Sequence, residues 1–347
     1  MLVQQALYAP HLWQVDRVRL AVGGAADAPI AALTASVLRA LLLAASNRRA
    51  AGIGSDVASL TLTQLAYISP ETPGSFGLAF EVAVHEAINA RQPEVCSLVS
   101  EAMAGSGVLT SRPRSLLFGA ERAAKLGYLE ALVQDLGEQP VLRIGAQRRG
   151  RPFSLSRWLP HLAQGWRGEA ALPSDIAKAW KADLLLADAE GSAFVTATVK
   201  SNALSLEGGP GLQLGIVPQI GSAWPPGVRT HKGLQVAILP DDGQFLQLLD
   251  AAHQTVMFAL AKLTGRPLLH RPVLAASKRL AEELIRWGDY PVAEVVATLT
   301  RRGQRDLVSE SMQDVLLSGV SAIEPGHVRV PDLIELESGL LVPKSAM

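Results

Sequence analysis

The stretch "KADLLLADAEGSAFVTATVKSN", residues 181–202, indicates the fold of the middle of the chain. Two apolar runs, DLLLA and SAFVTATVK, flank a DAEG sequence that is typical of a tight turn. We therefore expect a β-hairpin made of core residues. A turn centred near residue 189 or 190 pairs residues whose numbers add to about 380. Asp183 is then expected opposite Ala197 or Thr198.

One acid and one base stand at the open end of this hairpin. Neighbouring strands lie about 4.8 Å apart, so Asp183, Thr198 and Lys200 are expected to crowd together. A carboxylate that holds Mg²⁺, beside a lysine that orients the attacking water, suits phosphodiester hydrolysis. Mg²⁺ prefers oxygen ligands, so neither cysteine nor histidine is required, and Mn²⁺ could replace it. The alternative is an ion pair without catalytic role, which typically contributes under about 1 kcal/mol.

The segments around the hairpin predict a mixed α/β (α+β) protein. A helix is expected over SFGLAFEVAVHEAINA, residues 75–90, with Glu81 and His85 beside its apolar face. Four residues form that face: Phe80, Val84, Ala87 and Ile88. A strand over residues 234–239 and a helix over residues 244–263 follow the hairpin. The pattern predicts a mixed central sheet flanked by helices, with helical additions at both ends.

The ends of the chain are assigned separately from this core. We predict an N-terminal extension over residues 1–70, a core over residues 71–265 and a mostly helical region over residues 266–347. Within the extension, a helix is expected around residues 30–45 and a short strand over residues 58–62. The helix is interrupted by Arg39 and rich in alanine, which favours a buried helix over a membrane span.

Composition limits the classes of function. Lysine plus arginine and aspartate plus glutamate number 32 each, so no global positive field draws the protein to nucleic acid. Contact with DNA would come from local basic patches, of which RIGAQRRGRPF, with Arg148, Arg149 and Arg151, is the strongest. Cys96 is the single cysteine, which excludes a disulfide framework and a cysteine zinc site and favours a reducing, cytoplasmic compartment. No signal peptide or membrane partner is expected.

Three further motifs are weighed and set aside. The glycine-rich EGGPGLQLG, residues 207–215, lacks the Gly-Lys-Ser/Thr ending of a phosphate-binding loop, so a connector is favoured. The sequence VHEAIN resembles the HExxH zinc motif, but Asn89 stands where the second histidine is required. Cys96 lies in an apolar helical context and is expected to be inert.

The order of these elements resembles the PD-(D/E)XK nuclease superfamily, whose restriction-endonuclease-like core is a helix, three strands, a helix and a further strand. The resemblance covers about residues 74–263. It implies that Glu81 in GLAFEVAV is the helical metal-associated glutamate and that Asp183 in KADLLL is the metal-binding aspartate. It also implies that Lys200 in TVK is the catalytic lysine. Gln213 in GLQLGIV is a weaker match to a polar residue that some members place after the lysine.

The resemblance implies a Mg²⁺-dependent DNA endonuclease, with a role in restriction or phage defence. Thr198 stands where the family has a second acid, two residues before the lysine. Four carboxylates could replace that acid: Glu81, Glu86, Asp188 and Glu207. The alternative function is a catalytically inactive nuclease-like fold that serves as a nucleic-acid-binding or scaffold subunit of a larger complex, and a homo-oligomer stays open. A separation of Asp183 and Lys200 beyond roughly 10 Å would instead favour an unrelated α/β protein.

Overall fold

The chain divides into two compact units. The computed structural model describes residues 27–49, 59–69, 73–118, 141–144, 151–154, 181–189, 193–209, 211–268, 271–272, 274–305, 333–335 and 341–343. The helical unit comprises Met1–Ala83 with Gln247–Met347, and the sheet unit comprises Val84–Leu246. Two helices, α4 (Pro73–Asn89) and α11 (Gln244–Thr264), cross this division. The domain boundaries predicted near residues 70 and 265 stay a prediction.

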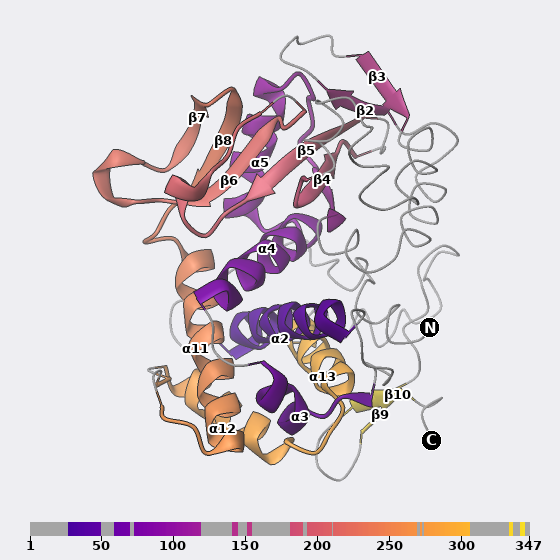
Figure 1. The fold of residues 1–347 in the computed structure, drawn as a ribbon, viewed down its shortest axis with the longest axis vertical. Helices are drawn as coiled ribbons and strands as arrows, with labels where there is room; N and C mark the ends of the chain where they lie inside the picture. Colours follow the sequence, from indigo (N-terminus) through magenta and orange to yellow (C-terminus); the bar gives the residue numbers. More distant parts are fainter. Residues whose placement is uncertain are drawn as a thin grey trace. The chain divides into compact units, whose positions relative to one another are not determined.

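The sheet unit is built on one mixed, open sheet (Figure 1). Its main strands follow the order β1, β4, β5, β6, β8, β7. Their bounds are β1 (Arg114–Leu116), β4 (Leu184–Ala187), β5 (Ala193–Val199), β6 (Leu214–Pro218), β7 (Gly227–His231) and β8 (Leu234–Leu239). β1 and β4 are antiparallel to their neighbours β4 and β5, the strands β5, β6 and β8 are parallel, and β7 is antiparallel to β8. A branch of β2 (Val141–Ile144) and β3 (Arg151–Ser154) joins the start of β5. The predicted α+β class is confirmed.

The predicted hairpin is present as β4 and β5. Leu184 pairs with Ala197, and the Asp183 amide donates to the Ala197 carbonyl at 2.9 Å, so Asp183 stands opposite Thr198. Every residue of both strands is buried, as expected in a sheet covered on both faces. Asp188 closes the turn, because its amide donates to the Ala193 carbonyl at 3.3 Å.

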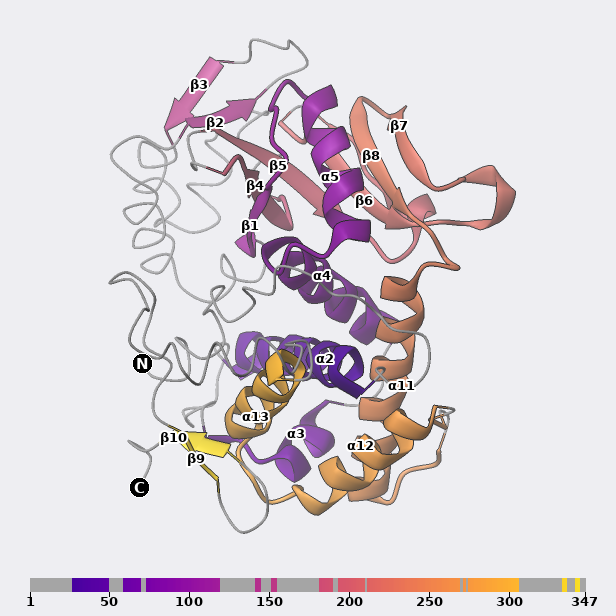
Figure 2. The same cartoon turned by 180° about the vertical axis from the view of Figure 1, so that it is seen from behind.

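Two helices pack on this sheet within the sheet unit. α5 (Pro93–Gly105) lies across β8, β6 and β7, as Figure 2 shows from behind. The end of α4 covers the outer edge of β1. There the Asn89 carboxamide accepts from the Ser115 amide at 2.9 Å and donates to the Ser115 carbonyl at 3.0 Å. An edge strand otherwise exposes unpaired backbone groups, so Asn89 has a structural role at the position where a zinc motif would need histidine.

The helical unit packs α2 (Asp27–Arg49) against α13 (Val292–Arg305), with α3 (Leu62–Ile68) and α12 (Ala275–Arg286) alongside (Figure 2). A short hairpin of β9 (Leu333–Glu335) and β10 (Leu341–Pro343) belongs to the same unit. The stretch Ala28–Ala45 of α2 is long and apolar enough to cross a membrane, but 83% of it is buried inside the protein. Its buried Arg39 donates to the Thr300 hydroxyl at 3.0 Å, which is the packing of a core helix.

Four other helices and strands predicted from the sequence are confirmed, and one predicted strand is wrong. The helices expected around residues 30–45, 75–90 and 244–263 are α2, α4 and α11, and the strand over residues 234–239 is β8. The strand expected over residues 58–62 is wrong, because Leu62 begins α3. Thr61 caps that helix in a capping box with Gln64, which fixes a helix start instead.

Candidate active site

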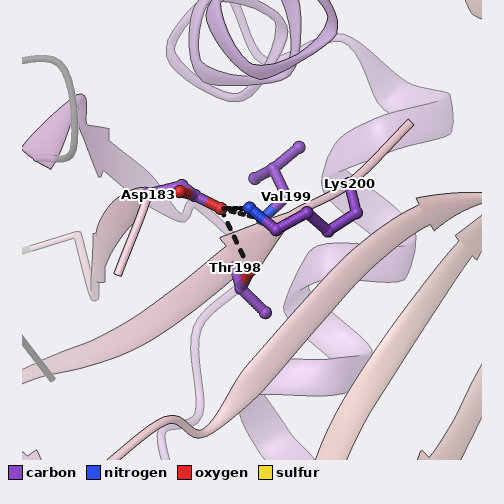
Figure 3. Close-up of polar contacts among 4 residues, drawn as sticks. All are labelled: Asp183, Thr198, Val199 and Lys200. Atoms are coloured by element: carbon purple, nitrogen blue, oxygen red, sulfur yellow. Dashed lines mark hydrogen bonds and ion pairs between the residues drawn. The ribbon is translucent and has the colours of Figure 1, made fainter. Parts of the chain in front are cut away.

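Asp183, Thr198 and Lys200 meet at the open end of the β4–β5 hairpin (Figure 3). One carboxylate oxygen, Asp183 Oδ2, accepts three hydrogen bonds. The donors are the Thr198 hydroxyl at 3.0 Å, the Val199 amide at 2.7 Å and Lys200 Nζ at 2.9 Å. The expected crowding is therefore present, and the ion pair is far shorter than the separation that would have favoured an unrelated protein.

The strand geometry explains this convergence. Asp183 is the residue before β4 and stands opposite Thr198, and side chains at opposite positions of neighbouring strands share one face. Lys200 follows Thr198 by two residues and continues on that face. The Asp183 side chain is 15% exposed and that of Lys200 is 36% exposed. The cluster is thus held by the sheet but open to solvent on the side of the lysine.

The carboxylate of Asp183 has a second oxygen, Oδ1. Among the residues that the structure describes, none donates a hydrogen bond to it. Three donors fix the orientation of the carboxylate through Oδ2, so Oδ1 is held in place and available. Its side chain is only partly buried, which gives solvent and small ions access.

This donor set can be tested against the magnesium ion that the family resemblance implies. Within the described ranges, no group of three or more histidine, cysteine, aspartate or glutamate side chains is placed to hold a metal ion. Mg²⁺ nevertheless binds proteins through one or two carboxylates and completes its shell with water and substrate phosphate. Asp183 Oδ1 fits that requirement as a single protein carboxylate ligand.

Of the remaining predicted site residues, Glu81 belongs to the other unit and Gln213 stands further along the sheet. Glu81 lies on α4, in the portion that belongs to the helical unit, and its metal role stays a prediction. Gln213 stands opposite Thr196 and precedes β6, four residues from the level of Lys200, which is about 13 Å along a strand. Its nucleic-acid role stays a prediction.

The predicted basic patch is only partly covered by the structure. Arg148 and Arg149 lie outside the described residues. Arg151 begins β3, and its side chain is also outside the description. Their contact with DNA therefore stays a prediction.

Of the acids considered as replacements for Thr198, Asp188 can be placed most clearly. It stands at the turn end of the hairpin, five residues from Asp183, which is about 16 Å along a strand. One metal ion cannot bind both carboxylates. Asp188 instead accepts from the Ala193 amide at 3.5 Å and belongs to the turn.

The glycine-rich segment is explained by packing. A side chain at Gly208 would overlap the Lys232 carbonyl in the β7–β8 turn. Lys232 Nζ in turn donates to the Leu206 carbonyl at 3.0 Å, and the Thr196 hydroxyl donates to the Gly211 carbonyl at 2.5 Å. These contacts support the predicted connector, because the loop needs its glycine for close approach to β7–β8.

The surroundings of Cys96 are those of an unreactive buried thiol. It is buried on α5, and its Sγ donates to the Ile88 carbonyl at 3.5 Å. Burial raises the pKa of the thiol from 9.0 to about 12, against the smaller opposing effect of Arg91. The thiolate, which is the reactive form, is therefore absent near neutral pH.

Comparisons with known proteins assign no family to the chain. No protein-family model, curated protein or solved structure matches it. A functional proposal therefore rests on the chemistry of Asp183, Thr198 and Lys200.

Proposed function

We propose that the protein is a metal-dependent DNA endonuclease with a restriction-endonuclease-like core. One observation carries the proposal. Asp183 and Lys200 share one site at 2.9 Å, while the other oxygen of the aspartate is fixed and available. Hydrolysis of a phosphodiester needs a metal ligand next to a cation at the reacting phosphate, and these two groups supply both.

The topology of the sheet supports the same proposal. The antiparallel strands β1, β4 and β5 lie side by side and are followed by the parallel strand β6, and α4 precedes them in the chain. Lys200 follows the carboxyl end of β5, next to β6, whose Ile216 carbonyl accepts from its amide at 3.0 Å. Ligands of open α/β sheets bind outside the carboxyl ends of parallel strands. The connection from β5 to β6 departs from the family pattern, because it carries only the short 3-10 helix η4 (Ala203–Ser205).

Each side chain of the site has a separate role in this proposal. A bound Mg²⁺ would polarise the phosphate and lower the pKa of its water. Asp183 would hold that ion through Oδ1, while Oδ2 keeps the carboxylate oriented by three donors. Lys200, with its side chain 36% exposed, would turn its ammonium toward the phosphate and offset the charge that develops there. Thr198 would keep Asp183 in position through its hydroxyl.

A second candidate function is favoured by Thr198 itself. Threonine supplies no negative charge where the family has its second acid, and its hydroxyl is used to bind Asp183. A site with one carboxylate holds a divalent ion weakly unless the substrate adds an anionic ligand. The second candidate is a nuclease-like subunit, in a restriction or defence complex, that binds DNA without cutting it.

The deciding experiment is a DNA cleavage assay on supercoiled plasmid and linear DNA with Mg²⁺, Mn²⁺ or EDTA. The wild-type protein, Lys200→Met and Arg112→Ala are compared at equal concentration. Arg112 is an exposed arginine of the same unit, just before β1, at the turn end of the hairpin. We expect metal-dependent cleavage by the wild type and the Arg112 variant, and a loss of at least about 100-fold in Lys200→Met. Binding without cleavage in any metal would favour the second candidate.

A further inference from the structure

One exposed leucine follows the candidate site, in the connector between β5 and β6. Leu204 lies four residues after Lys200, within the 3-10 helix η4, and it is 75% exposed. Among the residues that the structure describes, three other large hydrophobic side chains are exposed: Tyr67, Leu109 and Leu274. Of these four, Leu204 is the one that the chain places beside the candidate site.

The connector lies on the same face of the sheet as the candidate site. Thr198 pairs with Gly215, so both point to one face, and Lys200 continues on it. On that face a Cβ atom at Gly215 would lie 2.9 Å from Leu206 Cδ2, so Leu206 packs directly on β6. The connector thus covers the sheet next to the site. A polymer bound at Lys200 therefore meets the outer surface of the connector and not the sheet.

The connector holds Leu204 in a defined position. Its neighbours Ala203 and Leu206 are buried, at 1% and 0% exposure. The Asn202 carboxamide accepts from the Leu204 amide at 3.0 Å, and Lys232 Nζ donates to the Leu206 carbonyl at 3.0 Å. A group that is already positioned in the free protein loses little conformational freedom when it binds a ligand.

The two leucines of the connector have opposite surroundings. Leu206 packs on β6, whereas most of the surface of Leu204 is in solvent. An apolar side chain beside a cation suits a ligand that has an anionic backbone and apolar surface close together. DNA offers both, because the faces of its bases become accessible where a base step opens, and leucine is among the side chains that insert there.

We propose that Leu204 inserts between base pairs of the DNA next to the phosphate bound at Lys200. This inference rests on the proposed function. Four residues span at most about 14 Å, which is about four base pairs at 3.4 Å of axial rise each. Pyrimidine–purine steps such as TA unstack and kink most easily. Insertion of Leu204 therefore gives the protein a preference for DNA that contains such steps.

The test compares two fluorescently labelled duplexes of equal length that contain only A·T pairs. One alternates T and A and so has a TA step at every second position, and the other has all adenines on one strand and no such step. Binding is measured by anisotropy in EDTA so that the DNA stays intact. We expect the wild type to bind the alternating duplex about tenfold more tightly, because less energy is needed to deform it.

Two substitutions at Leu204 show whether its side chain causes that preference. Leu204→Ala should reduce the preference to about twofold or less, while Leu204→Met, which keeps an apolar wedge of similar volume, should retain it. Neither change removes a charge, so the slope of log Kobs against log salt should stay that of the wild type.

The matched control is Leu109→Ala. Leu109 is an exposed leucine of the same unit, at 84% exposure, and it follows the end of α5 by four residues. Leu109→Ala should keep the full preference for the alternating duplex. Because both leucines are exposed, urea denaturation should give the wild-type midpoint for Leu204→Ala and for Leu109→Ala.

The outcomes separate this inference from the proposed function. A preference that Leu204→Ala keeps, or that Leu109→Ala loses equally, would overturn the role of Leu204 and leave Lys200-dependent cleavage untouched. Equal binding of both duplexes by the wild type would do the same. Absence of any duplex binding by the wild type would overturn both. Cleavage that does not depend on Lys200 would overturn the proposed function even if the preference depends on Leu204.

Discussion

Two carboxylates of the sheet unit, Asp183 and Glu94, are each held by a backbone amide. They differ in the surroundings of the second carboxylate oxygen. Asp183 accepts from the Val199 amide at 2.7 Å, and Glu94 accepts from the Phe245 amide at 3.1 Å. Asp183 therefore joins the two strands of one hairpin, and Glu94 joins two segments that are 151 residues apart in the sequence. Glu94 Oε1 is buried without a hydrogen-bond partner among the described residues, in contact distance of Gly243. Asp183 Oδ1 belongs to a side chain that solvent still reaches.

The difference separates a structural carboxylate from a candidate functional one. Glu94 lies in the first turn of α5 and caps the first turn of α11, where backbone N–H groups lack helical partners. Its Oε1 is enclosed by that packing, and its Oε2 accepts from the Phe245 amide. Asp183 is equally well oriented but keeps one oxygen for a ligand. Orientation by the fold is common to both, and access of the second oxygen is what distinguishes them.

The largest expected effect on stability comes from closing the space beside Glu94. A side chain in Gly243→Ala would overlap the Glu94 carboxylate, which must then leave the Phe245 amide. We expect the free energy of unfolding to fall by about 1–3 kcal/mol, the usual range when a cap is lost in a packed site. Urea denaturation measures it.

The double variant Gly243→Ala with Glu94→Ala provides the control. Removing the carboxylate removes the overlap, so the double variant should be less destabilised than the sum of the two single variants. Additive losses would mean that Glu94 and Gly243 do not interact as described.

A smaller effect is expected at the donors of Asp183. Thr198→Val removes a hydroxyl that donates to Asp183. Thr196→Val, on the same strand β5, removes a hydroxyl that donates to the Gly211 carbonyl. Each should lower the free energy of unfolding by about 1 kcal/mol. Only Thr198→Val should also slow cleavage, by up to about tenfold, which corresponds to about 1.4 kcal/mol in the barrier. Equal cleavage in both variants would show that the Thr198 hydroxyl does not position Asp183.

The smallest effect concerns Cys96 and alkaline pH. Burial raises the pKa of the folded thiol to about 12, while the unfolded thiol ionises near its ordinary value of 9.0. Above pH 9 the unfolded chain loses a proton that the folded chain keeps, so the stabilising contribution of the thiol is complete below that pH and declines as the pH rises. Between pH 8 and 9.5, the wild type should lose somewhat under about 1 kcal/mol more than Cys96→Ala. The same loss in both proteins would contradict the raised pKa.

Much of the hairpin could be predicted from the sequence, because a turn signal lies between two apolar runs. The turn places Asp183 opposite Ala197 or Thr198, and only the paired strands show that Thr198 is its partner. The helix start at Thr61 was also present in the sequence, as the capping-box pattern Thr61 to Gln64 before an apolar run. It was missed because residues 58–62 alone look like a short strand.

Other features depend on tertiary pairing and leave no comparable pattern. β6 is the five-residue run LGIVP, which contains a glycine and ends in proline, and β7 is a partly exposed edge strand that only its pairing with β8 defines. The Val199 amide could not be found either, because every residue except proline carries the same backbone donor.

The most direct test of the central claim compares Asp183→Asn with Glu94→Gln in the cleavage assay with Mg²⁺. Both changes are isosteric and remove one negative charge from a carboxylate that the fold orients. We predict that Asp183→Asn loses at least about 100-fold in cleavage, while Glu94→Gln loses stability but cleaves within about threefold of the wild type when both are folded. Wild-type cleavage by Asp183→Asn would contradict the assignment of Asp183 as the metal-binding carboxylate.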